Sequence, residues 1–142
     1  MVGVGDAAHG DDGAGPFVAK TLEQAGVPNV INSGAAPELD TWRIREIGPD
    51  SVLFVDAVDF GGKPGEVAFL KPSDLSSAGF DTHRAPLRFT MKYLEDDLGC
   101  CCLLLAIQPK DVRYGLPMCE EVQKSSLQIA DMLRTILGDL RR

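Results

Sequence analysis

Ser51–Val58 (SVLFVDAV) is the stretch that decides the fold class of this 142-residue chain. It is apolar almost throughout, which is typical of a strand that is covered on both faces in a parallel sheet. Cys100–Ile107 is expected to be a second buried strand, and shorter strands are expected at Met1–Gly5, Val30–Ile31 and Glu66–Leu70. Because helical patterns separate these strands, the sequence predicts an α/β fold in which a mainly parallel sheet has helices on both sides.

Hydrophobic spacing, with glycine and proline at the ends, predicts four helices. The first begins at Pro16 and stops at Gly26, and the others cover Pro37–Ile47, Pro86–Leu98 and about Pro117–Leu137. The side chains expected to face inward are Leu39, Trp42 and Ile47 in the second helix, Leu87, Met91, Leu94 and Leu98 in the third, and Val122, Ile129, Leu133 and Ile136 in the fourth.

The composition is that of one ordinary domain, which we expect to span residues 1–142. Fourteen basic and 21 acidic residues give a net charge of −7, which disfavours binding to nucleic acid or to an anionic membrane. We expect no signal peptide in the first 15 residues, and the longest apolar run is too short for membrane insertion. Its four cysteines form neither a zinc pattern nor a disulfide framework, so we expect a reduced, cytoplasmic protein.

Three loops are expected at the carboxyl ends of the strands, where ligands bind in such folds: Asp6–Gly15, Asp56–Gly62 and Gln108–Gly115. A loose G-x-G-x-x-A match, Gly3–Ala8, leads into the first loop, but Asp11 and Asp12 would repel a pyrophosphate. The same loop suits a cation, since its glycines can turn tightly and present short carboxylates. The alternative is that Asp11 and Asp12 cap a helix, and one can cap while the other binds.

Asp56 follows an apolar strand, and a carboxylate there needs a partner or a function. Its alternative role is a hydrogen bond to neighbouring loop amides. His83 precedes the third helix, and His9 lies within the glycine loop; either can be an ordinary surface histidine. The chain has no G-x-S-x-G motif, and its cysteines are best explained as apolar packing residues. A covalent nucleophile is therefore not expected.

In chain order, several short segments match the pattern of one protein family. They are Val2–Asp6 with Gly10–Pro16, Gly34–Glu38, Val55–Asp59, Thr82-His83 with Pro86-Leu87, and Ile107–Pro109. Together they resemble the hydrogenase maturation proteases. These endopeptidases remove a C-terminal peptide from the precursor of the [NiFe]-hydrogenase large subunit.

The resemblance implies a three-layer fold with a twisted sheet of about five strands between helices. It also implies that Asp12, Asp56 and His83 contact nickel, and that Asp12 or Asp56 is the catalytic carboxylate that activates water. We expect the substrate to be bound by Gly10, Asp11, Gln108 and Pro109. The nickel ion (Ni2+) is expected to arrive with the substrate, and other divalent cations can substitute for it. The expected partner of this monomer is the large-subunit precursor.

Three positions depart from the family pattern. Asp6 and Ala106 replace the usual Asn and Gly, and Asn32 stands where many members have Asp. The first strand is also short. Asn32 and the short strand favour an alternative, in which the chain is a nickel-binding or checkpoint module of hydrogenase assembly without proteolytic activity.

Overall fold

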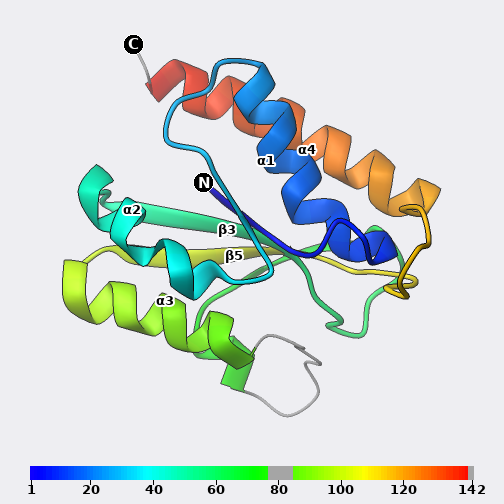
Figure 1. The fold of residues 1–142 in the computed structure, drawn as a ribbon, viewed down its shortest axis with the longest axis horizontal. Helices are drawn as coiled ribbons and strands as arrows, with labels where there is room; N and C mark the ends of the chain where they lie inside the picture. Colours follow the sequence, from blue (N-terminus) through cyan, green and yellow to red (C-terminus); the bar gives the residue numbers. More distant parts are fainter. Residues whose placement is uncertain (77–84, 141–142) are drawn as a thin grey trace.

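The computed structural model describes residues 1–76 and 85–140, and within them five strands form one sheet (Figure 1). The strands are β1 (Val2–Val4), β2 (Ile31–Gly34), β3 (Ser51–Ala57), β4 (Val67–Leu70) and β5 (Cys101–Ile107). Their order is β2-β1-β3-β5-β4, in which β4 runs antiparallel to β5 and the other neighbours are parallel. The expectation of a mainly parallel, five-stranded sheet is confirmed, and β3 is its central strand.

Helices cover both faces of the sheet, as predicted (Figure 1). On one face lie α1 (Ala14–Gln24) and α4 (Glu120–Leu140), and on the other lie α2 (Thr41–Ile47) and α3 (Ala85–Leu98). Short 3-10 helices precede α1, α2 and α3 in the chain: η1 (Gly10–Gly13), η2 (Pro37–Asp40) and η3 (Asp74–Ser76). The carboxyl ends of β1, β3 and β5 therefore open on the side where η1 connects β1 to α1.

Alternation along the strands builds two hydrophobic cores, one on each face of the sheet. Phe54 and Leu104 point toward α2 and α3, whereas Val55 and Leu105 point toward α1 and α4. The third helix packs as expected, because Leu87, Met91 and Leu94 are all buried and Leu98 packs partly against the same core. In the fourth helix the expected Val122, Ile129 and Leu133 are buried.

The inward face that we predicted for the second helix is wrong. The expected Leu39, Trp42 and Ile47 are 70%, 55% and 41% exposed, whereas Ile44 is buried at 2%. The reason is that the segment is divided into a 3-10 turn and a short α-helix, and the tighter turn changes the angular position of every later side chain. At the end of α4, Leu137 packs against the core in place of the expected Ile136, which is 47% exposed.

Two substitutions test this corrected inward face of η2 and α2. We expect Ile44→Ala to lower the free energy of unfolding by about 2–4 kcal/mol, because it leaves a cavity in a closed core. Leu39→Ala removes an exposed side chain and should change stability by no more than about 0.5 kcal/mol. Urea unfolding of both variants measures the difference, and equal losses would contradict the assignment.

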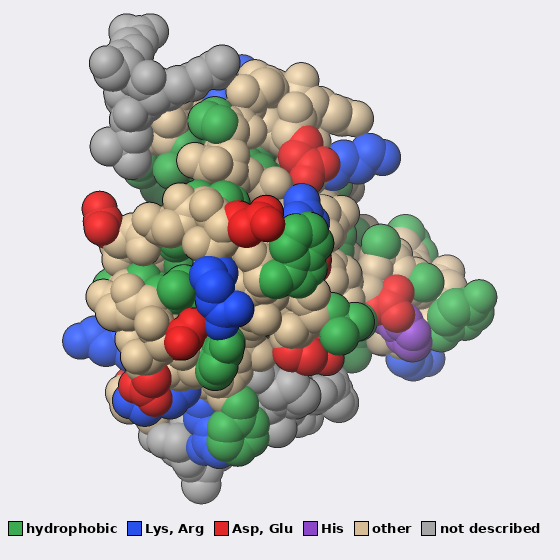
Figure 2. Space-filling view, turned by 60° about the vertical axis from the view of Figure 1, so that its left-hand side comes forward, with side chains coloured by type: hydrophobic (Ala, Val, Ile, Leu, Met, Phe, Trp, Pro, Cys, Tyr) green, Lys and Arg blue, Asp and Glu red, His purple; other side chains and the backbone are tan. Residues whose placement is uncertain are grey.

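Acidic and basic side chains are interspersed over one face of the molecule, with hydrophobic side chains between them (Figure 2). The surplus of acidic residues is thus not gathered into a single block on this face. In the described part of the chain, none of the helices combines the length and the apolar character that crossing a membrane requires.

Candidate active site

Two glycines bring η1 and the start of α1 onto the carboxyl edge of the sheet. A Cβ on Gly15 would overlap the carbonyl oxygens of both Val4 and Val55, which belong to β1 and β3. Gly5 has a φ of +148°, and a Cβ there would overlap the carbonyl oxygen of Asp12. The loop can follow this path only with glycine at both positions, because backbone lies against backbone. Besides the tight turn that the sequence predicts at Gly15, the structure shows that this glycine allows a close approach of two backbones.

Asp12 lies on η1 and is half-buried. Its Oδ2 accepts the backbone N–H of Asp6 at 3.0 Å, and its own N–H donates to the carbonyl of His9 at 3.0 Å. The carboxylate is therefore oriented by the loop that follows β1. This position, close to the ends of the central strands, is compatible with a role in binding or catalysis.

Asp56 is completely buried near the carboxyl end of β3. Its side chain lies on the same face of the sheet as those of Phe54 and Val58, which is the face that packs against α3. In the sheet it pairs with Ala106 of β5. A carboxylate in an otherwise apolar row does not improve packing, and burying its charge is costly. Its place in the central strand, next to the end where η1 lies, therefore favours a functional role.

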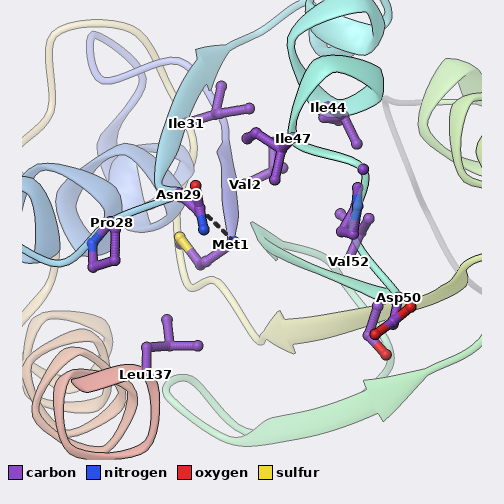
Figure 3. Close-up of a pocket in the computed structure, with 13 residues that line it drawn as sticks. Met1, Val2, Pro28, Asn29, Ile31, Ile44, Ile47, Asp50, Val52 and Leu137 are labelled. Carbon is purple, nitrogen blue, oxygen red and sulfur yellow. Dashed lines mark hydrogen bonds between the residues drawn. The ribbon is translucent and has the colours of Figure 1, made fainter. Parts of the chain in front are cut away.

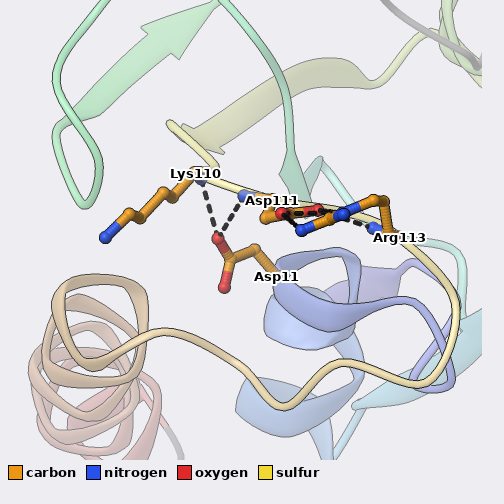
Figure 4. Close-up of polar contacts among 4 residues, drawn as sticks. All are labelled: Asp11, Lys110, Asp111 and Arg113. Atoms are coloured by element: carbon orange, nitrogen blue, oxygen red, sulfur yellow. Dashed lines mark hydrogen bonds and ion pairs between the residues drawn. The ribbon is translucent and has the colours of Figure 1, made fainter.

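Asp11 is the neighbour of Asp12 but has a different environment. It is completely buried, and its Oδ2 accepts the backbone N–H groups of Lys110 at 2.7 Å and Asp111 at 3.0 Å (Figure 4). Its Oδ1 accepts the N–H of Cys119 at 2.7 Å, just before α4 begins. The negative charge thus lies near the N-terminus of α4, where the helix dipole stabilises it. The three hydrogen bonds also join η1 to the segment after β5. The N-caps of η1 and α1 make no side-chain hydrogen bond, so the capping alternative is not met at the helix that follows the loop; Asp11 instead binds the segment that leads into α4.

Further contacts join the loop around η1 to residues 111–115. Gly10 has a φ of +55°, and a Cβ there would lie 2.6 Å from the carbonyl oxygen of Asp111. The N–H of Gly115 donates to Ala8 at 2.8 Å. His9 places its Nδ1 3.3 Å from the carbonyl oxygen of Val112 and contacts the ring of Tyr114 edge-on. Through these contacts His9 and Gly10 join the loop around η1 to the segment after β5.

Gln108 organises the loop after β3. Its buried side chain accepts the N–H groups of Phe60 at 2.9 Å and Gly62 at 3.0 Å, and it donates to Asp59 Oδ1 at 3.1 Å. Hydrogen bonds from Gly61 and Gln108 lower the pKa of Asp59. Pro109, which follows, is half-buried. The sequence did not predict this cluster, although the Asp59-x-Gly61 spacing is typical of an Asx turn.

The structure brings Asp12 and Asp56 to the same edge of the sheet, since η1 lies against β3. His83 lies outside the described residues, so its approach to these carboxylates stays a prediction. Within residues 1–76 and 85–140, no group of three or more His, Cys, Asp and Glu side chains could hold a metal ion. Two carboxylates with an imidazole are nevertheless a donor set that suits a transition metal.

Three of the four cysteines lack the properties of a catalytic nucleophile. Cys100 and Cys102 are buried in the apolar core, as expected for packing residues, and burial together with Cys100 raises the pKa of Cys102. Cys101 is exposed, so the prediction of a packing role is wrong for this residue. Burial, and to a smaller extent the hydrogen bond to Asp11, raises the pKa of Cys119 to about 11. This thiol is therefore protonated at neutral pH, which makes it a poor nucleophile.

A hollow of about 390 Å³ lies at the opposite edge, near the amino ends of β1 and β3 (Figure 3). Met1, Asn29, Ile47, Asp50 and Leu137 are among the residues that line it. The Met1 ammonium donates to the carbonyl of Asn29 at 3.0 Å, and burial lowers its pKa. Because Asp12 and Asp56 lie at the carboxyl edge, this hollow is separate from the candidate site.

Comparison with known proteins gives one consistent result. A family model, HycI hydrogenase maturation protease, matches residues 16–138. The Hydrogenase 3 maturation protease of Escherichia coli (strain K12) is 39% identical over 123 residues, which cover 84% of this chain and 78% of that protein. The crystal structure of a [NiFe] hydrogenase maturation protease HycI from Thermococcus kodakarensis KOD1 has a TM-score of 0.88 at 30% identity, covering 96% of this chain and 90% of that one.

The solution structure of an endopeptidase HycI from Escherichia coli agrees, with a TM-score of 0.83 at 34% identity over 94% of this chain and 87% of that one. The chain is therefore a hydrolase of the peptidase class, built on an α/β fold. It belongs to the hydrogenase maturation protease family, as the matching segments of its sequence predicted.

Proposed function

We propose that this chain removes the C-terminal peptide from the nickel-loaded precursor of a [NiFe]-hydrogenase large subunit. The observation that carries the proposal is the pair of carboxylates at the edge of the sheet, in a chain of this family. Asp56 is completely buried near the end of the central strand β3, and Asp12 lies on η1, which contacts that strand. In this proposal the nickel ion is part of the substrate, and the enzyme recognises it before it cleaves the precursor.

Asp12, Asp56 and His83 would then act as oxygen and nitrogen donors toward the precursor's nickel site. Three protein donors leave positions for the ligands that the precursor itself supplies. Other divalent cations in the precursor would be recognised in the same way. Either Asp12 or Asp56 would accept a proton from the water that attacks the scissile peptide bond.

The loops that surround these carboxylates would form the contact with the precursor. Gly10 and Asp11 hold η1 against residues 110–119, and Gln108 and Pro109 fix the path of the chain after β5. We propose that these four residues shape the substrate-binding surface through the backbone that they position. A rigid edge of this kind keeps the catalytic carboxylates at fixed distances from the bound peptide.

The proposal is tested by incubating the purified chain with a large-subunit precursor, loaded with nickel in one sample and free of nickel in the other. We expect intact-mass spectrometry to show loss of a C-terminal peptide only from the loaded precursor. Equal cleavage of both samples would contradict nickel recognition. Tight association without release of a peptide would contradict the protease and favour a checkpoint module.

Isosteric variants test the two carboxylates. We expect Asp12→Asn and Asp56→Asn each to lower the rate of cleavage about 100-fold or more, because a general base or a metal-binding carboxylate is lost. Asp131→Asn, on an exposed turn of α4, is the matched control and should cleave at the normal rate. Circular dichroism checks that the three variants are folded, and normal cleavage by both site variants would refute the assignment.

A further inference from the structure

A groove outside the candidate active site lies between α3 and the start of β5. Its volume is about 580 Å³, which is within the range of sites that take a ligand or a peptide side chain. Residues 71–73, which follow β4, form its third side. No residue that we have placed in catalysis or substrate binding lines it.

The charge of this groove is opposite to that of the chain. Of the side chains in the described residues that line it, Lys71, Arg88 and Lys92 are basic and Glu95 alone is acidic. The chain as a whole carries a net charge of −7. Lys92 also has an ion pair with Asp96 at 3.7 Å, but both side chains are well exposed, and such pairs are weak. The groove is therefore a local site of attraction for an anionic partner.

An apolar surface accompanies these charges. Phe89 is 60% exposed on α3 and lines the groove together with the half-buried Leu103. The guanidinium of Arg88 lies 4.6 Å from the centre of the Phe89 ring, which keeps both groups on one surface. An exposed aromatic residue beside a basic one is a frequent anchor of protein interfaces.

The backbone along the groove favours recognition by side chains over addition of a strand. Among the described strands, β4 ends at Leu70 opposite Leu104, so no strand pairs with the outer side of Cys102. The carboxylate of Glu95, however, accepts the N–H of Cys102 at 3.1 Å. Since this covers the donor that an added strand would use, a partner has to bind through its charges and its apolar groups.

We propose that this groove docks an acidic stretch of polypeptide that carries a large apolar side chain. The partner's carboxylates pair with Lys71, Arg88 and Lys92, and its apolar side chain packs against Phe89 and Leu103. The proposal goes beyond the cleavage reaction, because neither the nickel ion nor the catalytic carboxylates take part in it. A second contact of this kind would add affinity for a protein partner without touching the scissile bond.

The test uses the full chain and a fluorescein-labelled peptide of glutamate and serine with one phenylalanine. We expect fluorescence anisotropy to show saturable binding that weakens as salt rises, because exposed charges are screened. The double variant Arg88→Glu/Lys92→Glu should bind the peptide about tenfold more weakly. Phe89→Ser should also weaken binding, and it should abolish the preference for the peptide with phenylalanine over one without it.

Lys20→Glu/Lys124→Glu is the matched control, since it reverses two exposed charges on α1 and α4 across the sheet. It changes the net charge equally and should bind the acidic peptide almost as the unaltered chain does. Thermal unfolding verifies that all variants are folded. Equal weakening in both double variants, equal binding of a lysine-containing peptide, or stronger binding of an RNA oligonucleotide would each overturn the proposal. Because the assay contains no precursor and no nickel, its outcome is independent of the cleavage experiment.

Discussion

Asp11→Ala is expected to lower the free energy of unfolding by about 3–5 kcal/mol, although Asp11 is one residue from a proposed catalytic carboxylate. The carboxylate of Asp11 accepts three backbone N–H groups, from Lys110, Asp111 and Cys119. Alanine leaves all three donors without this acceptor and removes a negative charge from the start of α4. Urea unfolding measures the loss, and hydrogen exchange should show faster opening of residues 110–119.

Asp11→Asn separates the contribution of hydrogen bonding to stability from that of side-chain shape. The two oxygens of Asp11 are both used, Oδ2 by two donors and Oδ1 by one. An asparagine keeps one oxygen and presents an N–H group to the remaining donor, so we expect an intermediate loss of about 1.5–3 kcal/mol. Asp131→Ala, which removes only an exposed ion pair with Arg134, should cost less than about 1 kcal/mol. A loss for Asp11→Ala no larger than this control would contradict the structural role.

The fold was predictable because hydrophobic pattern and burial agree along the central strands. The alternating burial of β3 and β5 produces the two cores, and the long apolar runs of both strands mark them as covered on both faces. The face of α2 was not predictable from periodicity, because a 3-10 turn precedes it and changes the phase of its side chains. Trp42 of α2 is apolar in the sequence and exposed in the structure for this reason, and Leu39, which lies in the 3-10 turn itself, is exposed as well.

The candidate site was predictable only in part. Sequence order placed Asp11 and Asp12 in one loop but could not distinguish them, since the difference depends on donors about 100 residues later in the chain. The role of Asp11 depends on the segment after β5, which lies against η1 only in the folded chain. Gln108 is similar, because its partners Phe60 and Gly62 belong to another loop. Asp56 could be identified from the sequence alone, since a carboxylate at the end of an apolar strand is unusual.

Gly15→Ala is expected to lower stability by about 3–5 kcal/mol or to prevent folding, although it adds a single methyl group to a helix. The added Cβ would overlap the carbonyl oxygens of Val4 and Val55, and backbone in the two central strands cannot rotate away as a side chain can. Relief requires α1 to move off the sheet, which also displaces η1 and with it Asp12.

Gly138→Ala is the control, because this glycine of α4 has no atom near the position of an added Cβ. There alanine should raise helix stability by up to about 1 kcal/mol. Thermal unfolding of the two variants should therefore shift in opposite directions, and a Gly15→Ala variant as stable as the unaltered chain would refute the close packing of α1 on β1 and β3.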